Sequence, residues 1–432
     1  MTDGRFYPST KAYRFVLLIF ISLLSFGTYF AYDIIGAVAP TLVKELGAQR
    51  STVGSMYTVY SIAAVLSVFI GGFMIDRLGT RKSSMIFSCL VVLGASGVAA
   101  ANSLPVLFIG RFIFGAGSEP LIVAQSAIIA RWFKNKEIAL AYGIALTVSR
   151  LGTLFSFNTG ELIVNRYGSY RYALIAAVLF CVLSLAANIV YVVMDRKGES
   201  ALRLEDQETA EKIVLKDIKD FKPSYWFVTL LCLTFYSAIF PFTALSTDFF
   251  VDKWGIQKVA VSGGGFFHEV FNNFLHMFST AGGITSIIIF ASMVFAPLAG
   301  HLLDKFGKRA TIMIWGSLIL IPSHLLLGLT HIYPAIPMIT LGAAFVLVPA
   351  ALWPSVPMVV HKDKIGTAFG LLTMIQNIGL AAFPFLNGKL RDATHSYTAS
   401  MLMFASLGVV GFIFAILLKR ADSKAGNVLE NP

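Results

Sequence analysis

One short motif occurs twice in the chain, each time at the end of a long apolar run. Residues 72–82 read G-F-M-I-D-R-L-G-T-R-K, and residues 300–309, which begin 228 positions later, read G-H-L-L-D-K-F-G-K-R. A motif repeated at this spacing predicts an internal duplication, in which two structurally related halves form one molecule. Duplicated sets of membrane helices are typical of secondary transporters. We therefore expect two pseudo-symmetric membrane halves.

The composition restricts the fold to membrane-spanning helices. Of the 432 residues, 56% are apolar and only 13% are charged, whereas a soluble domain carries about 25% charged residues. The mean hydropathy is +0.75. In a bilayer, only helices and closed barrels satisfy every backbone polar group. Because the apolar runs are about twenty residues or longer, and barrel strands need only about ten, we predict an all-α membrane protein.

Twelve apolar runs are long enough to cross a bilayer. We predict spans at residues 14–40, 51–76, 83–103, 106–130, 138–165, 171–194, 224–250, 276–303, 310–330, 333–360, 365–388 and 397–418. The six-helix halves are residues 1–194 and 223–432, and residues 195–222 form a charged, solvated linker. We interpret residues 261–279 as an amphipathic helix at the outer membrane interface. A substrate lid and the start of the eighth span are the alternatives.

The distribution of basic residues predicts the orientation of the spans. An even number of spans places both termini on one side, and cytoplasmic loops carry an excess of Lys and Arg. With the termini and the even-numbered loops assigned to the cytoplasm, that side carries 24 basic residues and the opposite side 8. We therefore predict cytoplasmic termini. The net charge of +11 then belongs to loops that face anionic lipid, which disfavours a nucleic-acid partner.

Further features favour a multi-pass protein of a bacterial inner membrane. The three cysteines lie inside apolar runs, no Asn-x-Ser/Thr sequence occurs, and the first run is too long for a signal-peptide core. No Walker motif is present, and His268-Glu269 lacks the second histidine of a zinc-protease helix. We expect a monomer in the lipid bilayer that is not an enzyme and needs neither a metal nor a cofactor.

Four ionisable residues are candidates at membrane depth, away from the ends of the predicted spans: Asp33, Arg111, Glu119 and Arg150. A charge at membrane depth costs at least about 2.5–3.5 kcal/mol, so each of them is a candidate for function. At 1.5 Å per residue, Glu119 lies about 18 Å and Arg150 about 20 Å from the cytoplasmic ends of their helices. Both are therefore near the midplane. A static ion pair that joins the two helices is the structural alternative.

The internal repeat argues against a static pair. Aligning Tyr142-Gly143 with Phe369-Gly370 at an offset of 227 superposes Gly152 on Gly379, but Arg150 on Asn377. The packing residues recur and the charge does not, so Arg150 is expected to serve a ligand or a switch in one half only. Other polar and aromatic residues could line the same cavity: Gln125, Tyr32, Tyr57, Tyr60, Tyr236, Trp353, Gln376 and Asn377.

On these motifs the chain resembles the major facilitator superfamily over essentially its whole length. Residues 72–82 match the family signature G-x-x-x-D-R-x-G-x-R-K, and residues 111–117 resemble its R-x-x-x-G-x-G element. The resemblance implies twelve transmembrane helices in two halves that rock about a central cavity. It also implies a gate in which Asp76 docks on the positive end of the eleventh helix. The residues that we assign to gating are Asp76, Arg77, Arg81, Asp304 and Arg111.

A narrower resemblance is to the lysosomal dipeptide transporter branch of the superfamily. It rests on residues 110–119, 124–125, 132–137, 149–152, 352–354 and 375–381. The branch consists of dipeptide uniporters, in which the residues that match Glu119 and Arg150 contact the termini of the peptide. We therefore predict a transporter of a small zwitterion, a dipeptide or an amino acid, in which Arg150 binds the carboxylate and Glu119 or Asp33 the ammonium group. The alternatives are an importer of an organic anion or carboxylate siderophore, and a sensor that binds without translocation. A coupling proton stays open.

Overall fold

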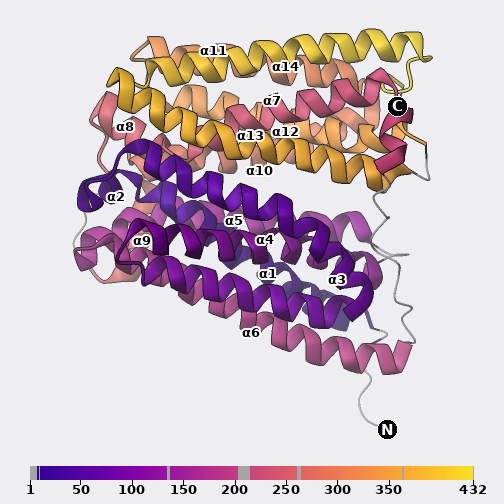
Figure 1. Cartoon of the computed structure of the whole chain (residues 1–432), viewed down its shortest axis with the longest axis horizontal. Helices are drawn as coiled ribbons and strands as arrows, with labels where there is room; N and C mark the ends of the chain where they lie inside the picture. Colours follow the sequence, from indigo (N-terminus) through magenta and orange to yellow (C-terminus); the bar gives the residue numbers. More distant parts are fainter. Residues whose placement is uncertain are drawn as a thin grey trace. The chain divides into compact units, whose positions relative to one another are not determined.

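The computed structural model of the chain describes residues 7–8, 10–133, 137–202, 215–259, 264–361 and 364–431. These residues form helices and no β-strand (Figure 1). Among them are eleven helices that are long and apolar enough to cross a membrane. One of these helices, α3, supplies two spans, so the predicted all-α fold of twelve spans is confirmed.

The first six spans are α1 (Lys11–Ala37), the two parts of α3 (Arg50–Ala99), α4 (Leu104–Phe133), α5 (Ile138–Tyr167) and α6 (Tyr170–Leu202). The two parts of α3 meet at Gly79, whose φ of 76° and ψ of 165° are not helical. Glycine adopts a positive φ without a steric penalty, so the turn of the repeated motif interrupts the helix at this residue. α6 ends at Leu202, eight residues beyond the predicted sixth span, because the helix continues into the charged linker.

The last six spans are α7 (Pro223–Thr243), α10 (Ala281–Phe306), α11 (Arg309–Leu329), α12 (Ala335–Val359), α13 (Ile365–Thr394) and α14 (Thr398–Lys424). A short 3-10 helix, η1 (Leu215–Asp220), precedes α7. The linker residues 203–214 lie outside the described part of the chain.

The first and seventh spans end earlier than we predicted, and the same local pattern follows each. α1 gives way at Val38 to the short helix α2 (Ala39–Leu46), and α7 gives way at Leu245 to α8 (Ser246–Trp254). Pro40 has no backbone N–H, so α1 cannot continue through it. α2 ends at Gly47 with a φ of 59°, and α8 ends at Gly255 with a φ of 62°. The internal duplication therefore includes a broken helix at one end of each half.

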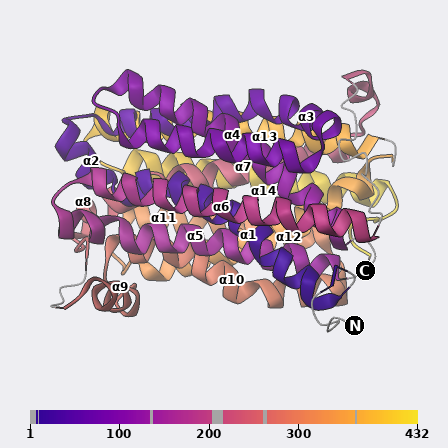
Figure 2. The same cartoon turned by 90° about the horizontal axis from the view of Figure 1, so that it is seen from below.

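The segment that we interpret as amphipathic contains α9 (Phe266–Leu275), and α10 starts only at Ala281. Residues 260–263 lie outside the described residues. The side chains of Phe267, Phe271 and Leu275 are exposed, whereas Asn273 is buried and its Nδ2 donates to the backbone oxygen of Asn158 at 2.6 Å. α9 lies at the same end as α2 and α8 (Figure 2). Its place in the outer membrane interface stays a prediction.

The chain forms two compact units that differ from the two sequence halves. Unit 1 contains residues 1–35, 59–156 and 166–210; unit 2 contains residues 36–58, 157–165 and 211–432. Unit 2 therefore includes α2, the first residues of α3 and a short part of α5 in addition to the whole second half. The predicted boundaries at 194 and 223 follow the duplication and stay a prediction.

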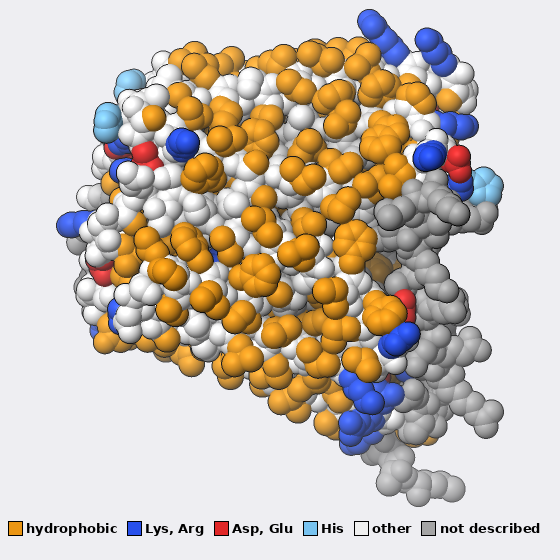
Figure 3. Space-filling model, viewed as in Figure 1, with side chains coloured by type: hydrophobic (Ala, Val, Ile, Leu, Met, Phe, Trp, Pro, Cys, Tyr) orange, Lys and Arg blue, Asp and Glu red, His pale blue; other side chains and the backbone are white. Residues whose placement is uncertain are grey.

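Both units carry large apolar side chains on the surfaces of their spans (Figure 3). In unit 1, Leu66, Ile70 and Leu179 are exposed, and in unit 2, Val294 and Leu298 are exposed. Lys and Arg side chains gather at helix ends in the same view. An apolar surface along the spans with basic residues at their ends is the pattern that a bilayer selects.

Candidate functional site

Three glycines bring the helices of unit 1 close together around the predicted charges. A Cβ atom at Gly115 would lie 2.6 Å from the backbone oxygen of Tyr60, so α4 touches α3 there. At Gly117 it would lie 2.8 Å from the oxygen of Phe87, and at Gly152, on α5, 2.4 Å from the oxygen of Phe26, on α1. Small residues allow this close backbone approach in membrane helices. The R-x-x-x-G-x-G element therefore packs helices.

Asp33 of α1 is buried between α5 and α4. Its Oδ2 accepts a hydrogen bond from Thr153 Oγ1 at 2.6 Å, and the guanidinium of Arg111 attracts it electrostatically. Arg111 is 1% exposed, donates to the backbone oxygen of Ala31 at 3.4 Å, and lies 5.6 Å from the ring centroid of Tyr32. The structure thus places Arg111, which we assigned to gating, in the same cluster as Asp33 and Tyr32.

Glu119 of α4 is held by Tyr60 of α3. The Tyr60 hydroxyl lies 2.8 Å from Glu119 Oε1, to which it donates, and 3.1 Å from Ser118 Oγ. The Tyr60 ring packs edge-on against Tyr32, with centroids 4.7 Å apart, and lies 5.4 Å from the Arg111 guanidinium. Tyr60 therefore connects the environment of Glu119 to that of Arg111.

Tyr29 is a residue of this arrangement that the sequence reasoning missed. Its phenol is within electrostatic range of Glu119, Asp33 and Arg150. Tyr29 precedes Asp33 by one helical turn, and side chains four residues apart share a face of a helix. The same spacing rule could have found Thr153, three residues after Arg150 on α5. We refer to Tyr29, Asp33, Arg111, Glu119 and Arg150, with Tyr32, Tyr60 and Thr153, as the charge cluster.

The charge cluster can bind both ends of a zwitterion. It contains two carboxylates and two guanidinium groups, so its formal net charge is zero when all four are ionised. A guanidinium binds a carboxylate through two parallel hydrogen bonds, and a carboxylate accepts hydrogen bonds from an ammonium group. The phenols of Tyr29 and Tyr60 can donate or accept a hydrogen bond. This chemistry suits a small solute that carries opposite charges.

The candidates from the second half form an aromatic cluster in unit 2. Trp353 Nε1 of α12 donates to the Tyr236 hydroxyl of α7 at 2.8 Å. Tyr236 stacks on Phe240 with an interplanar angle of 5°, and Trp353 stacks on Phe369 at 20°. On α13, the remaining two candidates also have partners: Gln376 Oε1 lies 3.7 Å from the Cys232 sulfur, and Asn377 Nδ2 donates to the oxygen of Thr373 at 3.0 Å.

Two of the predicted site residues are engaged in helix packing. The Tyr57 hydroxyl accepts a hydrogen bond from the backbone N–H of Gly36 at 2.9 Å, in unit 2. Gln125 Nε2 donates to the backbone oxygen of Ile21 at 2.9 Å and lies 3.1 Å from Ser25 Oγ, which ties α4 to α1. These side chains therefore contribute to helix packing, and their role in substrate binding stays a prediction.

At the cytoplasmic end predicted for unit 1, the repeated motif meets a buried aspartate that the sequence reasoning also missed. Asp195 is fully buried, and its Oδ2 pairs with Arg131 Nη1 at 3.2 Å and with Arg81 Nε at 3.5 Å. Trp132 Nε1 donates to its Oδ1 at 2.6 Å. Asp195 lies directly after the predicted sixth span. Its position at the end of a span, on the side that carries the basic loops, could have predicted an ion pair.

The other gating candidates lie at exposed positions. Asp76 and Asp304 are exposed, each in its own unit. The guanidinium of Arg77 lies 4.4 Å from the ring centroid of Phe73. Among the described residues, no group of three or more His, Cys, Asp or Glu side chains could hold a metal ion.

Known proteins resemble this chain over nearly its full length. The family model for the Major Facilitator Superfamily matches residues 21–268 and 266–431. The chain is 32% identical over 429 residues to the lysosomal dipeptide transporter MFSD1 of Danio rerio, a match that covers 96% of this chain and 88% of that protein. It is 22% identical over 427 residues to the hexuronate transporter of Bacillus subtilis (strain 168), covering 95% of this chain and 97% of that protein.

A solved structure shares the fold. The crystal structure of a bacterial homologue of the human lysosomal transporter Spinster, in an inward-facing and occupied conformation, matches with a TM-score of 0.72 at 15% identity. The match covers 96% of this chain and 99% of that one. The family model, the long relative and the twelve helical spans agree with the resemblance that the motifs indicate. The chain therefore belongs to the major facilitator superfamily, and it is a secondary transporter of that family, not an enzyme.

Proposed function

We propose that this transporter carries a small zwitterion, a dipeptide in the first instance, by alternating access. The observation that supports the substrate class best is the charge cluster inside the apolar spans of unit 1, in which the phenol of Tyr29 is within electrostatic range of Glu119, Asp33 and Arg150, and Arg111 is within range of Asp33. Placing four charges inside apolar membrane spans is costly unless they serve a ligand or one another. The name of the relative in Danio rerio supports a dipeptide.

Each member of the charge cluster has a proposed role. Arg150 binds the C-terminal carboxylate of the peptide, and Glu119 or Asp33 binds its N-terminal ammonium group. Tyr60 keeps the Glu119 carboxylate in place through its 2.8 Å hydrogen bond. Tyr29, which lies within range of three of the charges, can bridge the peptide to them.

The proposed contribution of unit 2 is contact with the body of the substrate. Tyr236, Trp353, Gln376 and Asn377 offer aromatic faces and amide groups. These groups accept side chains of varied size and polarity, which a transporter of many dipeptides requires. We further propose that Asp76, Arg77, Arg81 and Asp304 act in the gate at the cytoplasmic side, where Asp195 already holds Arg81.

An organic anion is the second candidate substrate, because the chain also resembles a hexuronate transporter. For such a solute Arg150 would matter and Glu119 would not. A sensor that binds without translocation would show binding but no flux. The proposed setting is a bacterial inner membrane with cytoplasmic termini and a monomeric protein; a coupling proton is compatible with two carboxylates in the cluster.

The test is thermal stabilisation of the purified protein, followed by flux. A ligand that binds the folded state raises the unfolding temperature, and the increase grows with the ratio of the free ligand concentration to the dissociation constant. We expect stabilisation by free dipeptides, less by N-acetylated or C-amidated forms, and none by glucuronate. Stabilisation by glucuronate alone would contradict a zwitterionic substrate and favour an organic anion. Uptake of a labelled dipeptide into proteoliposomes then distinguishes a transporter of dipeptides from a sensor.

A further inference from the structure

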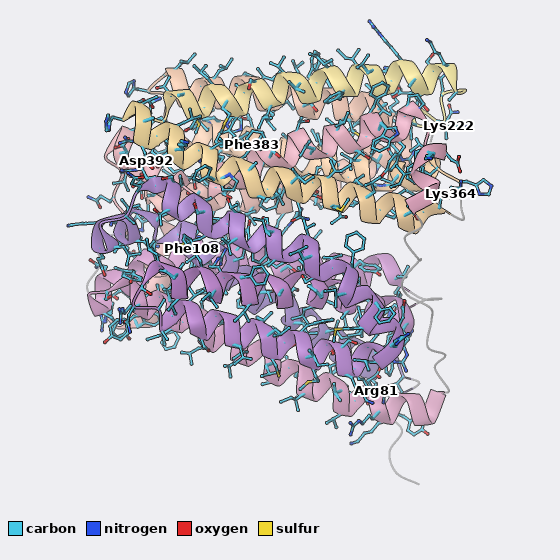
Figure 4. The ribbon with its side chains drawn as sticks, in the orientation of Figure 1. Arg81, Phe108, Lys222, Lys364, Phe383 and Asp392 are labelled. Carbon is cyan, nitrogen blue, oxygen red and sulfur yellow. The ribbon has the colours of Figure 1, made fainter. Side chains whose placement is uncertain are left out.

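The first turn of α3 is capped by a side chain from the other half of the sequence. The carboxylate of Asp392, near the end of α13, accepts the backbone N–H of Arg50 at 3.0 Å and that of Ser51 at 2.9 Å. The first N–H groups of a helix have no partner within the helix, and a carboxylate there also interacts with the positive end of the helix dipole. Both segments belong to unit 2, and Asp392 lies at the end opposite Lys222 and Lys364 (Figure 4).

The side chain of Arg50 makes a second connection to the later half. Its Nε donates to Asp248 Oδ2 of α8 at 2.6 Å, and the Tyr397 hydroxyl donates to the same oxygen at 2.6 Å. Burial and the neighbouring Asp248 carboxylate raise the pKa of Tyr397 well above its ordinary value, so the phenol stays protonated and remains a donor. Asp248 is 5% exposed, which shields these charge-assisted bonds from water.

Close backbone contact brings the capping residue into range. A Cβ atom at Gly388, one turn before Asp392, would lie 2.4 Å from the backbone oxygen of Arg50. A Cβ atom at Gly54 would lie 2.1 Å from the oxygen of Pro384. α3 and α13 therefore touch along one full turn at this end, and only glycine permits the approach.

The corresponding helix of the second half is capped by groups of its own half. α10 begins the second span of its half, as α3 does in the first, and its N-cap Thr280 accepts the N–H of Gly283 at 3.2 Å. The N–H of Ala281 donates to the backbone oxygen of Gln257 at 2.9 Å, so both acceptors belong to the second half. In α3, the N–H of Thr52 donates to the backbone oxygen of Gln49 at 3.0 Å, but the N–H groups of Arg50 and Ser51 are capped by Asp392 from the other half of the sequence.

We propose that Asp392 and Asp248 form a latch that holds the outer end of α3 against α13 and α8. Admission of a solute from the outer side requires the outer ends of the two halves to separate, so the latch must open in each cycle. Opening leaves two N–H groups of α3 without Asp392 and separates Arg50 from Asp248. The latch therefore sets how often the outer end opens, and this inference rests on alternating access but not on the identity of the substrate.

Asp252 provides a matched control for the latch. Its Oδ1 pairs with Arg391 Nη2 at 2.8 Å, at the same end of unit 2 and one residue from Asp392. Both partners belong to the second half, on α8 and α13. The Asp252→Asn substitution therefore removes the same charge at the same end without touching α3.

The experiment measures access to a covered position. Thr58 of α3 donates to the backbone oxygen of Ala381 on α13, so Thr58→Cys reports separation of these helices. The native Cys89, Cys181 and Cys232 are first replaced so that only the introduced cysteine can react. An impermeant maleimide then labels this cysteine with no substrate present. We expect Asp392→Asn to raise the labelling rate about tenfold, which corresponds to a loss of about 1.4 kcal/mol from the closed state. Asp252→Asn should change it less than twofold.

Two outcomes overturn the latch: an unchanged labelling rate in Asp392→Asn, or an equal increase in Asp252→Asn. A thermal unfolding transition in each variant shows that labelling does not report unfolding. If Asp392→Asn does not fold, Tyr397→Phe replaces it, because that variant removes one donor to Asp248 and keeps every charge. We expect Tyr397→Phe to raise the labelling rate about threefold. An unchanged labelling rate in this variant would contradict the latch. Since no substrate is used, failure of the latch leaves the dipeptide proposal standing, and failure of dipeptide binding leaves the latch standing.

Discussion

The charge cluster of unit 1 and the aromatic cluster of unit 2 occupy related places in the duplicated chain. Gly152 and Gly379 align in the repeat, and both mark a tight helix crossing. A Cβ atom at Gly152 would lie 2.4 Å from the oxygen of Phe26, and one at Gly379 would lie 1.9 Å from Ser237 Oγ. Two residues before these glycines, the sequences diverge to Arg150 and Asn377.

This difference separates packing from chemistry. The crossing of α5 with α1 and that of α13 with α7 need a small residue in both halves, because the helices approach closely in each. No packing requirement calls for a guanidinium in one half and an amide in the other. The charges are therefore the part of the duplication that one half has modified, and we expect them to determine which solute is bound.

The largest expected effect separates Arg150 from its repeat partner. Arg150→Ala should weaken binding of a free dipeptide by up to a hundredfold, because losing a charge-assisted hydrogen bond costs about 1.5–3 kcal/mol. Asn377→Ala should weaken it by about threefold or less, since it removes only a neutral amide. Ligand-induced shifts in unfolding temperature, titrated over dipeptide concentration, compare the two. Equal losses of dipeptide affinity in both variants would contradict the proposal that the charges of the first half determine which solute is bound.

A somewhat smaller effect tests the carboxylate side of the charge cluster. Glu119→Gln keeps the shape and an acceptor for Tyr60 but removes the charge. We expect about a tenfold loss for peptides with a free N-terminus and almost none for N-acetylated peptides. The same titration with both peptide forms measures this preference. An equal loss for both forms would favour the structural ion pair over a binding role.

The two glycine crossings should differ in stability when a methyl group is added. At Gly152 the obstacle is the backbone oxygen of Phe26, which cannot move without shifting α1; at Gly379 the nearest atoms are the Ser237 hydroxyl and Leu233 Cδ1, which are side-chain ends. Gly152→Ala should destabilise the fold by about 1–3 kcal/mol, and Gly379→Ala by less. Thermal unfolding without ligand makes the comparison. The reverse order would show that the second crossing is the less adaptable one.

The smallest expected effect concerns the aromatic cluster. Trp353→Phe removes the 2.8 Å hydrogen bond to Tyr236 and preserves most of the stacking surface. The loss should be about 0.5–1.5 kcal/mol of stability, with dipeptide affinity lowered only a few-fold. Unfolding temperature and binding are measured on the same preparation. A loss of binding as large as that in Arg150→Ala would place the main recognition in unit 2.

Most of the fold could be predicted from the sequence because hydropathy and helix length are local properties. Two details of the spans could not. The break after α1 follows from Pro40. The equivalent break after α7 lies at Leu245, four residues after Pro241, and α7 contains this proline without ending at it, so hydropathy alone shows no interruption there. The extension of α6 to Leu202 runs through charged residues, which a hydropathy pattern assigns to a linker.

The candidate site was predicted in part. Asp33, Glu119 and Arg150 stand out because charge is rare inside apolar runs. Tyr29 does not stand out, because a tyrosine inside a span is usually a packing residue. Its importance appears only in the folded chain, where it is within electrostatic range of Glu119 on α4 and Arg150 on α5. Gln125 and Tyr57 looked equivalent to the other polar candidates, yet hydrogen bonds to Ile21 and Gly36 engage them in packing.

The sequence by itself determined the class of this protein. Its apolar runs, its basic asymmetry and its repeated motif follow from the physics of burying helices in lipid, which acts on each segment separately. The tertiary structure decided the pairings: Asp195 with Arg81 and Arg131, Tyr60 with Glu119, and Asp392 with the start of α3. These partners are 59 to 342 residues apart, and a hydrogen bond or ion pair across such a separation depends on where the packed helices place both side chains.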